Sequence, residues 1–429
     1  MFYLIYNLLS VVLVVPVLVY HLYRSISRGR PPAMAERFGY IPAGELAKIG
    51  SRPVIWLHAV SVGESIAARP LLKALRSRYP AHAILISNTT ETGRGIASSF
   101  PEADLCIYFP FDFLPAVRRA LDLVRPKLVI IMETEIWPNF NREASRCKIP
   151  VILANGRISD RSFGRYLTFS WFFRHALQLM STLCMQTDTD RERIVAIGAP
   201  PERTIRSGNL KYDIPFRQVT QDEKLSLRER YQILAERTVF TAGSTHPGEE
   251  ELILKAYREL LPDCSDLLLV LVPRHPERAE AVGKMLEAEK FAYRRRTALN
   301  NGPASIFQAG EVLLVDTVGE LMDLYALSDA VFVGGSLVPT GGHNLLEPAA
   351  VGVASIFGPH MTNFREITGL VLQYGAGIQV ETPAALVDSC RALIASPELR
   401  RVLGQNGLKL MRDNGGATER HMEIIGRYL

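Results

Sequence analysis

The sequence predicts an α/β fold in which two doubly wound parallel sheets follow an apolar N-terminal helix. Short apolar runs alternate with amphipathic helical patterns in two successive series, and this alternation pauses once, at residues 208–215. Apolar strands separated by helices are typical of parallel sheets covered on both faces. The N-terminal helix is predicted by residues 2–23, a stretch of 22 residues without Asp, Glu, Lys or Arg.

Each series gives a set of expected elements. The first predicts strands near 53–58, 83–88, 105–109, 128–132, 151–154 and 183–186, and helices near 64–78, 92–99, 113–123, 139–146 and 162–178. The second predicts strands near 238–242, 267–272, 312–315, 330–333 and 353–357, and helices near 248–260, 276–289, 319–326, 344–351 and 383–394. We therefore expect an anchor and hinge over 1–30, a first Rossmann-like domain over 31–211 and a second over 212–429. Ligands are expected in a cleft between the carboxyl edges of the two sheets.

The N-terminal apolar stretch is long enough to span a hydrocarbon core of roughly 30 Å. Arg24, Arg28 and Arg30 follow it, and no small-residue cleavage site does, which favours a retained anchor over a cleaved signal peptide. The positive-inside rule then places the globular part in the cytoplasm. Because Asn7, Pro16 and several tyrosines interrupt the stretch, a helix lying in the membrane interface is the alternative.

Composition excludes several classes of protein. A net charge of +5 over 429 residues is too small to indicate nucleic-acid binding. The five cysteines are far apart and form no CxxC pair, which argues against a disulfide framework or a zinc site and suits a reducing compartment.

The stretch at residues 58–64, HAVSVGE, connects the first predicted strand to its helix. A strand, a glycine-bearing turn and a helix N-terminus in this order form anion or nucleotide sites in α/β proteins. Glu64 is a carboxylate in that position, so it is a candidate catalytic base. Ser61 and Glu64 also fit the S-x-x-E capping box, in which the glutamate only binds a backbone N–H.

Other charged residues follow strands of the first half. Glu133 and Glu135 come directly after the predicted strand at 128–132, and in an extended chain they would share one side. With Lys211 they form either a polar wall of the site or an interdomain salt bridge. Residues 157–175 combine Arg157, Arg161, Arg165 and Arg174 with six aromatic residues. This pattern favours either an anionic lipid head group at a membrane surface or a helix whose aromatic residues are half in the core.

In the second half, candidate ligand-binding residues follow the predicted strands. Arg274 offers a fork of donors suited to phosphate, or it caps a helix or pairs with Glu277. Glycines and a helix start surround His343 and Glu347, where a carboxylate can accept hydrogen bonds from ribose hydroxyls. His343 is equally well explained as an ordinary loop histidine. The amides at Gly319–Glu320 could bind a base or phosphate, or this stretch is simply a helix start.

Six motifs occurring in order resemble one family: HAVSVGE (58–64), METEIWPN (132–139), GNLKYD (208–213), PRHPER (273–278), VGEL (318–321) and GGHNLLEPA (341–349). Together they resemble the bacterial 3-deoxy-D-manno-octulosonic acid (Kdo) transferases, over nearly the whole chain.

The resemblance implies a GT-B fold and a membrane-associated enzyme of the bacterial inner membrane with its catalytic part on the cytoplasmic side. It would transfer Kdo from CMP-Kdo to the lipid A precursor, with inversion. It implies Glu64 as general base, with Glu135 and Lys211 assisting at the transition state. The CMP-contacting positions that it implies are Pro273, Arg274, Val318, Gly319, Glu320, Asn344, Leu345, Leu346 and Glu347.

The residues suit this chemistry, because Arg274 and backbone amides can stabilise a departing phosphate. No DxD motif or His-rich ligand set stands out, so we expect no protein-bound metal and no cofactor. The alternatives are another GT-B protein, such as a UDP-N-acetylglucosamine-type epimerase, and a membrane-tethered nucleotide-sugar-binding scaffold without catalysis.

Overall fold

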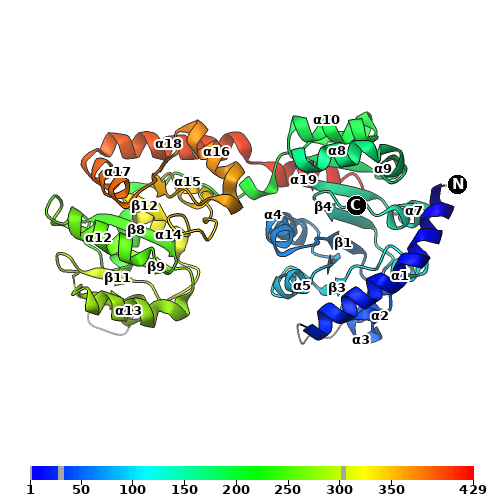
Figure 1. Ribbon diagram of the computed structural model, residues 1–429, viewed down its shortest axis with the longest axis horizontal. Helices are drawn as coiled ribbons and strands as arrows, with labels where there is room; N and C mark the ends of the chain where they lie inside the picture. The colour runs from blue at the N-terminus through cyan, green and yellow to red at the C-terminus, as the bar shows by residue number, and fades with distance from the viewer. Residues whose placement is uncertain (1, 28–32, 301–305) are drawn as a thin grey trace. The chain divides into compact units, whose positions relative to one another are not determined.

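The protein forms two compact units in the computed structural model, which describes residues 2–27, 33–300 and 306–429 (Figure 1). Unit 1 comprises Met1–Asp213 and Gly415–Leu429, and unit 2 comprises Ile214–Asn414. The chain thus returns to unit 1 for its last segment, whereas the expected second domain ran from 212 to 429. The expected join at 211/212 lies close to the observed one.

Unit 1 contains a seven-stranded parallel sheet of order β3-β2-β1-β4-β5-β6-β7. Its strands are β1 (Val54–His58), β2 (Ala83–Asn88), β3 (Leu105–Tyr108), β4 (Leu128–Met132), β5 (Val151–Gly156), β6 (Thr182–Met185) and β7 (Thr204–Arg206). Six of these match the predicted strands, and β7 was not predicted because three residues give no recognisable period. The strand order reverses at β1, so the loops after β1 and β4 flank the topological switch point.

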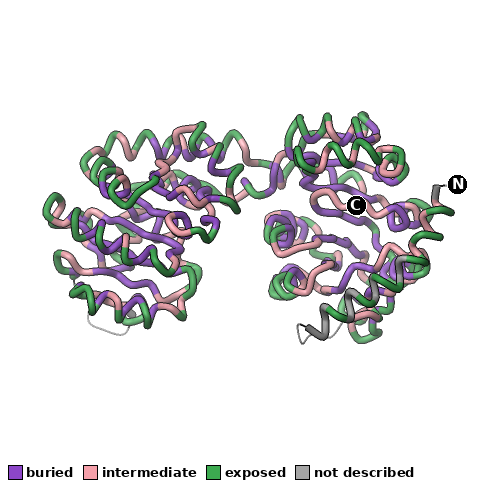
Figure 2. The backbone as a smooth tube through the Cα atoms, viewed as in Figure 1, coloured by how far each residue is buried: buried purple, intermediate pink, exposed green. Residues whose placement is uncertain are grey.

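The helices of unit 1 cover both faces of this sheet. They are α1 (Phe2–Ser27), α2 (Met34–Arg37), α3 (Ala43–Leu46), α4 (Val62–Arg78), α5 (Glu91–Ala97), α6 (Leu114–Val124), α7 (Pro138–Arg146), α8 (Asp160–Thr168), α9 (Ser170–Leu177), α10 (Asp188–Ile197) and α19 (Ala417–Ile425), with 3-10 turns η1 (Pro201–Arg203) and η2 (Leu210–Tyr212). Strand β1 is buried throughout (Figure 2). Trp56 packs with α6 and α7, whereas Ile55 and Leu57 pack with α4 and α19. Residues 162–178, predicted as one helix, form the two helices α8 and α9, which meet at Phe169.

Unit 2 contains a second parallel sheet, of order β10-β11-β9-β8-β12-β13-β14. Its strands are β8 (Thr238–Thr245), β9 (Leu267–Pro273), β10 (Tyr293–Arg295), β11 (Val312–Leu314), β12 (Ala330–Val333), β13 (Ser355–Phe357) and β14 (Gly377–Gln379). The short edge strands β10 and β14 were not predicted. The helices are α11 (Gln221–Arg230), α12 (Glu250–Leu260), α13 (Ala279–Ala288), α14 (Leu321–Leu327), α15 (Leu346–Ala350), α16 (Arg365–Tyr374), α17 (Pro383–Ala395) and α18 (Pro397–Asn414), with 3-10 turns η3 (Pro276–Arg278), η4 (Arg296–Asn300) and η5 (Thr362–Phe364). The order reverses at β8, between β9 and β12.

Polar residues attach helix α1 to unit 1. The Tyr6 hydroxyl donates to Asp112 Oδ2 (2.7 Å), and Asn139 Nδ2 donates to Asn7 Oδ1 (2.8 Å). The polar residues that interrupt the apolar stretch therefore hold this helix against the protein. Apolar side chains at other positions are exposed, among them Leu4 (73%) and Val12 (66%).

Over the described part of the chain, no helix combines the length and apolarity needed to cross a bilayer. The membrane anchor over 1–30 stays a prediction. The hinge residues Arg28 and Arg30 lie outside the described residues.

Candidate active site

Glu64 lies in the first turn of helix α4, directly after the switch-point strand β1. The Ser61 hydroxyl caps this helix, with Glu64 N 3.4 Å from its Oγ. The Glu64 carboxylate in turn accepts hydrogen bonds from Val60 N to Oε2 (2.7 Å) and from Ser61 Oγ to Oε1 (3.0 Å). The helix cap by Ser61 is therefore present, but the glutamate accepts the N–H of Val60 and the Ser61 hydroxyl rather than the N–H of Ser61 that a full capping box requires.

The capping bonds do not keep Glu64 strongly acidic. Burial raises the pKa of Glu64 from 4.5 to about 7, against the hydrogen bond from Val60, and the negative charge of Glu133 adds to the rise. The Ser61 hydroxyl and the Lys211 ammonium oppose it without cancelling it. A carboxylate whose pKa is near neutrality is suited to accept a proton at physiological pH, which is the property of a general base.

Glu133 and Glu135 follow β4, the neighbour of β1 in the sheet. The extended geometry expected here is wrong, because Glu133 starts a turn and adopts a left-handed conformation with φ 55°. Non-glycine residues held in this region cost about 1–3 kcal/mol and cluster at functional sites. Burial raises the pKa of Glu135 to about 7, and the charges of Glu64 and Glu133 contribute. The three carboxylates thus form one acidic group at the carboxyl edge of the first sheet.

Lys211 is the cation of this group, and it projects from η2 as an exposed side chain. Asn155, at the end of β5, positions η2: its Oδ1 accepts the Leu210 N–H (2.9 Å), and its backbone N–H donates to His421 Nε2 (3.2 Å). No motif indicates this role, since Asn155 lies just past the strand predicted over 151–154 and precedes a glycine. Because Glu133, Glu135 and Lys211 all belong to unit 1, the interdomain salt bridge suggested by the sequence does not apply to them.

His58 is the first residue of the HAVSVGE motif and is fully buried. Its ring stacks on Phe109 with centroids 3.8 Å apart, and Nδ1 lies 3.0 Å from Ser87 Oγ. Burial lowers the pKa of His58 to about 3, so this histidine is neutral. It supports the end of β1, from which the loop to α4 and Glu64 begins.

Asp112 is a second supporting residue, and sequence reasoning did not identify it. Its carboxylate accepts hydrogen bonds from the first two N–H groups after the start of α7, those of Asn139 (2.9 Å) and Phe140 (2.8 Å), as well as from Tyr6. Burial raises the pKa of Asp112 to about 6. Asp112 thereby joins α1 to the helix that follows Glu135.

The arginine and aromatic segment lies next to the same acidic group. Burial and the charge of Glu135 raise the pKa of Tyr166, on α8, and the nearby Arg165 opposes this rise. Since Tyr166 is close enough to Glu135 to sense its charge, α8 borders the site. Arg161, Arg165 and Arg157 are exposed. Phe163, Tyr166 and Phe173 pack against the core, as the half-core alternative requires. Leu167, Phe169 and Trp171 are 44–63% exposed instead. The segment is thus a half-buried helix pair with an exposed apolar and basic side.

In unit 2, Arg274 and Glu347 lie at the carboxyl edge of the second sheet. Arg274 is exposed after Pro273, which is the buried last residue of β9, and its backbone N–H donates to Thr245 O (3.0 Å). Glu347 is in the first turn of α15, where burial raises its pKa and Arg274 opposes the rise. Arg274 therefore faces Glu347, which disfavours the pairing with Glu277.

The other predicted CMP-contacting residues differ in what they can offer. Leu345 and Leu346 are fully buried, so only their backbone can meet a ligand, and Asn344 Oδ1 already accepts the Leu346 N–H (3.1 Å). Glu320 accepts hydrogen bonds from Arg296 Nε (2.7 Å) and Tyr231 OH (2.7 Å). Its carboxylate is thus engaged with the protein. The preceding Gly319 has φ 87°, and Val318 is 79% exposed, so this turn presents mainly backbone.

Two residues at the switch point of unit 2 were missed. Glu249 is fully buried and accepts hydrogen bonds from the N–H groups of Gly335 (2.7 Å), Ser336 (2.9 Å) and Leu337 (2.9 Å). It thereby fixes the conformation of the glycine loop after β12. His246 stacks on His343 with 2.8 Å between their Nε2 atoms. Burial lowers the pKa of His343 to about 4, so His343 is a partly buried neutral residue of this loop cluster.

Within the described residues, no three His, Cys, Asp or Glu side chains are placed to hold a metal ion together. The five cysteines form no disulfide.

Comparison with known proteins gives the family. Residues 33–214 match the family model described as 3-Deoxy-D-manno-octulosonic-acid transferase (kdotransferase). A 3-deoxy-D-manno-octulosonic acid transferase of Haemophilus influenzae is 38% identical over 402 residues, which cover 92% of this chain and 91% of that protein. The chain belongs to the Kdo transferase family. A Kdo transferase of Bordetella pertussis is 31% identical over 406 residues, covering 92% of this chain and 91% of that protein.

The family membership confirms the resemblance seen in the sequence, and it makes the protein a glycosyltransferase. Among solved structures, the UDP-GlcNAc 2-epimerase from Neisseria meningitidis bound to UDP-GlcNAc superposes with a TM-score of 0.55 at 15% identity, over 87% of this chain and 100% of that one. This likeness confirms the predicted GT-B type of fold. It does not extend to the epimerase activity, because the identity is too low.

Proposed function

We propose that this Kdo transferase moves Kdo from CMP-Kdo to a hydroxyl of the lipid A precursor, with inversion at the anomeric carbon and Glu64 as general base. The observation that carries the proposal is the pKa of Glu64, raised to about 7 in the first turn of α4 at the switch point of unit 1. A carboxylate whose only task is to cap a helix gains nothing from burial that weakens its ionisation.

In the proposed reaction, the acceptor hydroxyl attacks the anomeric carbon of Kdo, its proton passes to Glu64, and the bond from that carbon to the CMP phosphate oxygen breaks. The base helps because the hydroxyl becomes a stronger nucleophile as its proton leaves. Glu135 and Lys211 lie beside Glu64 and assist as charges, Lys211 by stabilising negative charge. Glu133 contributes by raising the pKa of the base.

Unit 2 would bind the donor. Arg274 can pair with the CMP phosphate as it leaves, Glu347 can accept ribose hydroxyls, and the backbone of residues 318–320 and 344–346 can contact the rest of the nucleotide. The chain would need no metal ion of its own, because Arg274 and backbone amides supply the charge stabilisation. We expect no cofactor besides the donor.

The acceptor is a phosphorylated lipid, so the protein has to work at a membrane surface. The exposed apolar side of α1, together with Leu167, Phe169 and Trp171, offers contact with acyl chains or the interface. Arg161, Arg165 and Arg157 would bind the lipid phosphate. We propose that the protein is attached to the bacterial inner membrane and faces the cytoplasm, as a step of lipopolysaccharide synthesis.

The test is mass spectrometry of products formed by the purified full-length protein from CMP-Kdo and the lipid A precursor. The proposal expects the acceptor mass to rise by Kdo residues and CMP to appear in equal number. Absence of such products with the folded wild type would refute the donor and acceptor assignment. If Arg161→Ala with Arg165→Ala left the KM for the lipid unaltered, the acceptor surface would have to be placed elsewhere.

A further inference from the structure

Unit 2 contains a cavity of about 560 Å³ that the proposed reaction does not use. It is lined by the starts of β8 and β12, the chain before helix α11, residues 351–354 after helix α15, and the start of helix α18. These are the amino ends of the parallel strands, whereas Arg274 and Glu347 lie at the carboxyl edge. Its volume is in the range of about 300–1,000 Å³ that small-molecule sites occupy.

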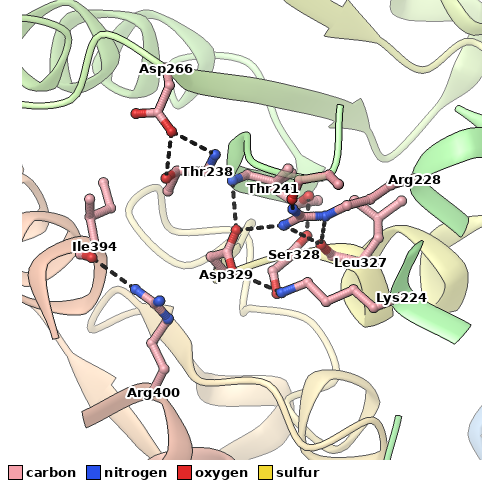
Figure 3. A network of polar contacts seen from close by, with 12 residues as sticks. Lys224, Arg228, Thr238, Thr241, Asp266, Leu327, Ser328, Asp329, Ile394 and Arg400 are labelled. Carbon is pink, nitrogen blue, oxygen red and sulfur yellow. Dashed lines mark hydrogen bonds and ion pairs between the residues drawn. The ribbon is translucent and has the colours of Figure 1, made fainter. Parts of the chain in front are cut away.

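The cavity is strongly basic. Five cationic and two acidic side chains line it: Lys224, Arg228, Arg237, Arg400, Arg401, Asp329 and Glu236. Lys224 and Arg228 share one carboxylate. Asp329 Oδ1 pairs with Lys224 Nζ (2.8 Å), and Asp329 Oδ2 pairs with Arg228 Nη2 (2.8 Å) (Figure 3). The side chains that line the cavity therefore carry a net positive charge.

Two of these arginines have only carbonyl oxygens as partners. Arg400 Nη1 donates to Leu393 O (2.6 Å). It also donates to Ile394 O (2.8 Å) (Figure 3). Arg237 Nη2 donates to two carbonyls, those of Phe307 (2.7 Å) and Gln308 (2.5 Å). Across the described residues, neither arginine forms an ion pair with a carboxylate. Arg237 is only 7% exposed, and its Nε has no hydrogen-bond partner.

Helix starts add to the positive potential. Thr220 and Gln221, which begin α11, and Pro397, which begins α18, all line the cavity. These two helices contain 10 and 18 residues, and the N–H groups of a helix start favour anions. Burial and the charges of Arg228 and Arg400 together lower the pKa of Lys224 despite Asp329. The single carboxylate of Asp329 thus does not offset burial and the repulsion between these cations.

A purely structural role accounts for part of this network. Arg228 is 5% exposed and binds Leu327 O, Ala235 O and Asp329, which ties α11 to the loop before β12. It does not account for the net positive charge around an open volume. Lys224 and Arg228 share the single carboxylate of Asp329, and Arg400 has only carbonyl oxygens as partners. Arg401 is exposed and pairs with Glu398 on its own helix.

We propose that this cavity is a second ligand site of the protein, one that binds a small anion carrying a diphosphate group. Guanidinium forks pair with phosphate oxygens in bidentate fashion, and several cations around one volume match an anion with several charges better than a monoester. Inorganic pyrophosphate and a nucleoside diphosphate share this chemistry and are the two sources to be distinguished.

The direct test is isothermal titration of the full-length protein with inorganic pyrophosphate and, separately, with CDP. We expect binding that weakens as salt is raised, because screening acts on every pair of opposite charges. CDP binding more tightly than pyrophosphate would identify a nucleotide as the natural ligand, and the reverse order would identify pyrophosphate itself. The Arg274→Gln variant separates the two sites, and pyrophosphate binding should survive in it.

Variants of the cavity give the matched comparison. Arg400→Gln combined with Arg401→Gln should weaken pyrophosphate binding at least tenfold, whereas Arg412→Gln, farther along helix α18 and outside the cavity, should leave it unchanged. If the double variant fails to fold, Arg401→Gln alone removes one charge and keeps the carbonyl contacts of Arg400. It should still weaken binding severalfold.

A measurement on the wild type needs no variant. The lowered pKa of Lys224 makes its amine reactive, so pyrophosphate should protect Lys224 from an acylating reagent, detected by peptide mass spectrometry, while the exposed Lys73 remains reactive. The proposal is overturned if pyrophosphate fails to bind at millimolar concentration. It is equally overturned if binding is lost in Arg274→Gln but kept in the cavity variants, or if Lys224 is not protected at saturation.

Discussion

Replacing Glu64 by Gln should remove catalysis and at the same time stabilise the protein. The glutamine keeps the shape of the side chain and an oxygen that can accept the Val60 N–H, which Glu64 accepts at 2.7 Å. It cannot take a proton from the acceptor. Removal of a general base lowers a rate by about 10²–10⁴-fold, and we expect kcat to fall in that range with little change in the affinity for CMP.

The stability change follows from the same pKa. In the unfolded chain Glu64 ionises near 4.5, whereas the folded protein holds its proton up to about pH 7. Wild-type stability therefore falls as pH rises from 4.5 to 7, and ionised Glu64 costs on the order of 3 kcal/mol above that range. Glutamine does not titrate but loses the contact with Ser61 Oγ. The net gain at pH 8 should be about 1–2 kcal/mol, with almost none at pH 4.5.

The assay is urea unfolding of both proteins at pH 8 and pH 4.5, combined with transfer kinetics. Glu251→Gln, an exposed position on α12, is the control and should change neither quantity. Ser61→Ala is the converse control, because loss of the helix cap should cost about 1 kcal/mol of stability while leaving the base in place. Transfer by Glu64→Gln within threefold of wild type would refute the assignment of the base. Equal stability differences at the two pH values would refute the account of its pKa.

Three further predictions concern charge. Glu133→Gln should move the acidic limb of the pH–rate profile to lower pH, because the charge of Glu133 helps to raise the pKa of Glu64; an unmoved limb would contradict this coupling. Asp329→Asn should lower the free energy of unfolding by about 3–5 kcal/mol, measured by urea denaturation, because it leaves Arg228 and Lys224 without their carboxylate. A loss below 1 kcal/mol would show that the pair is better solvated than the structure indicates. Treatment with EDTA should leave the transfer rate unaltered, and a loss restored by Mg²⁺ or Mn²⁺ would contradict a metal-independent reaction.

The sequence predicted the elements that carry strong periodicity. Strand β1 and helix α4 were placed within two residues, because five consecutive buried positions and a capping Ser leave little choice. Short edge strands such as β7 were not predicted, since three residues cannot show a hydrophobic period. The return of the chain to unit 1 was not predicted either, because the sequence of an amphipathic helix such as α19 does not indicate which of the two cores will bury it.

The candidate site could be predicted from the sequence only in part. The motifs predicted that Glu64, Glu135 and Lys211 belong together, and the structure brings them into one group in unit 1. The left-handed turn at Glu133 could not be predicted, because nothing in the local sequence distinguishes a glutamate with a left-handed backbone from one in an extended strand. Asp112 and Asn155 were missed for a similar reason. The partners of the Asp112 carboxylate lie 27–106 residues away along the chain, and Leu210 and His421 lie 55 and 266 residues from Asn155, so no motif unites them.

Helix α19 also sets an order of events during synthesis on the ribosome. Met422, Ile424 and Ile425 complete the core beneath β1, and Asp213 holds the start of this helix through the N–H groups of Ala417 and Thr418. These residues emerge only after the whole of unit 2 has been made. The nascent chain must therefore carry unit 1 with one side of its core uncovered while unit 2 is translated, and unit 2 is the part that can finish folding first.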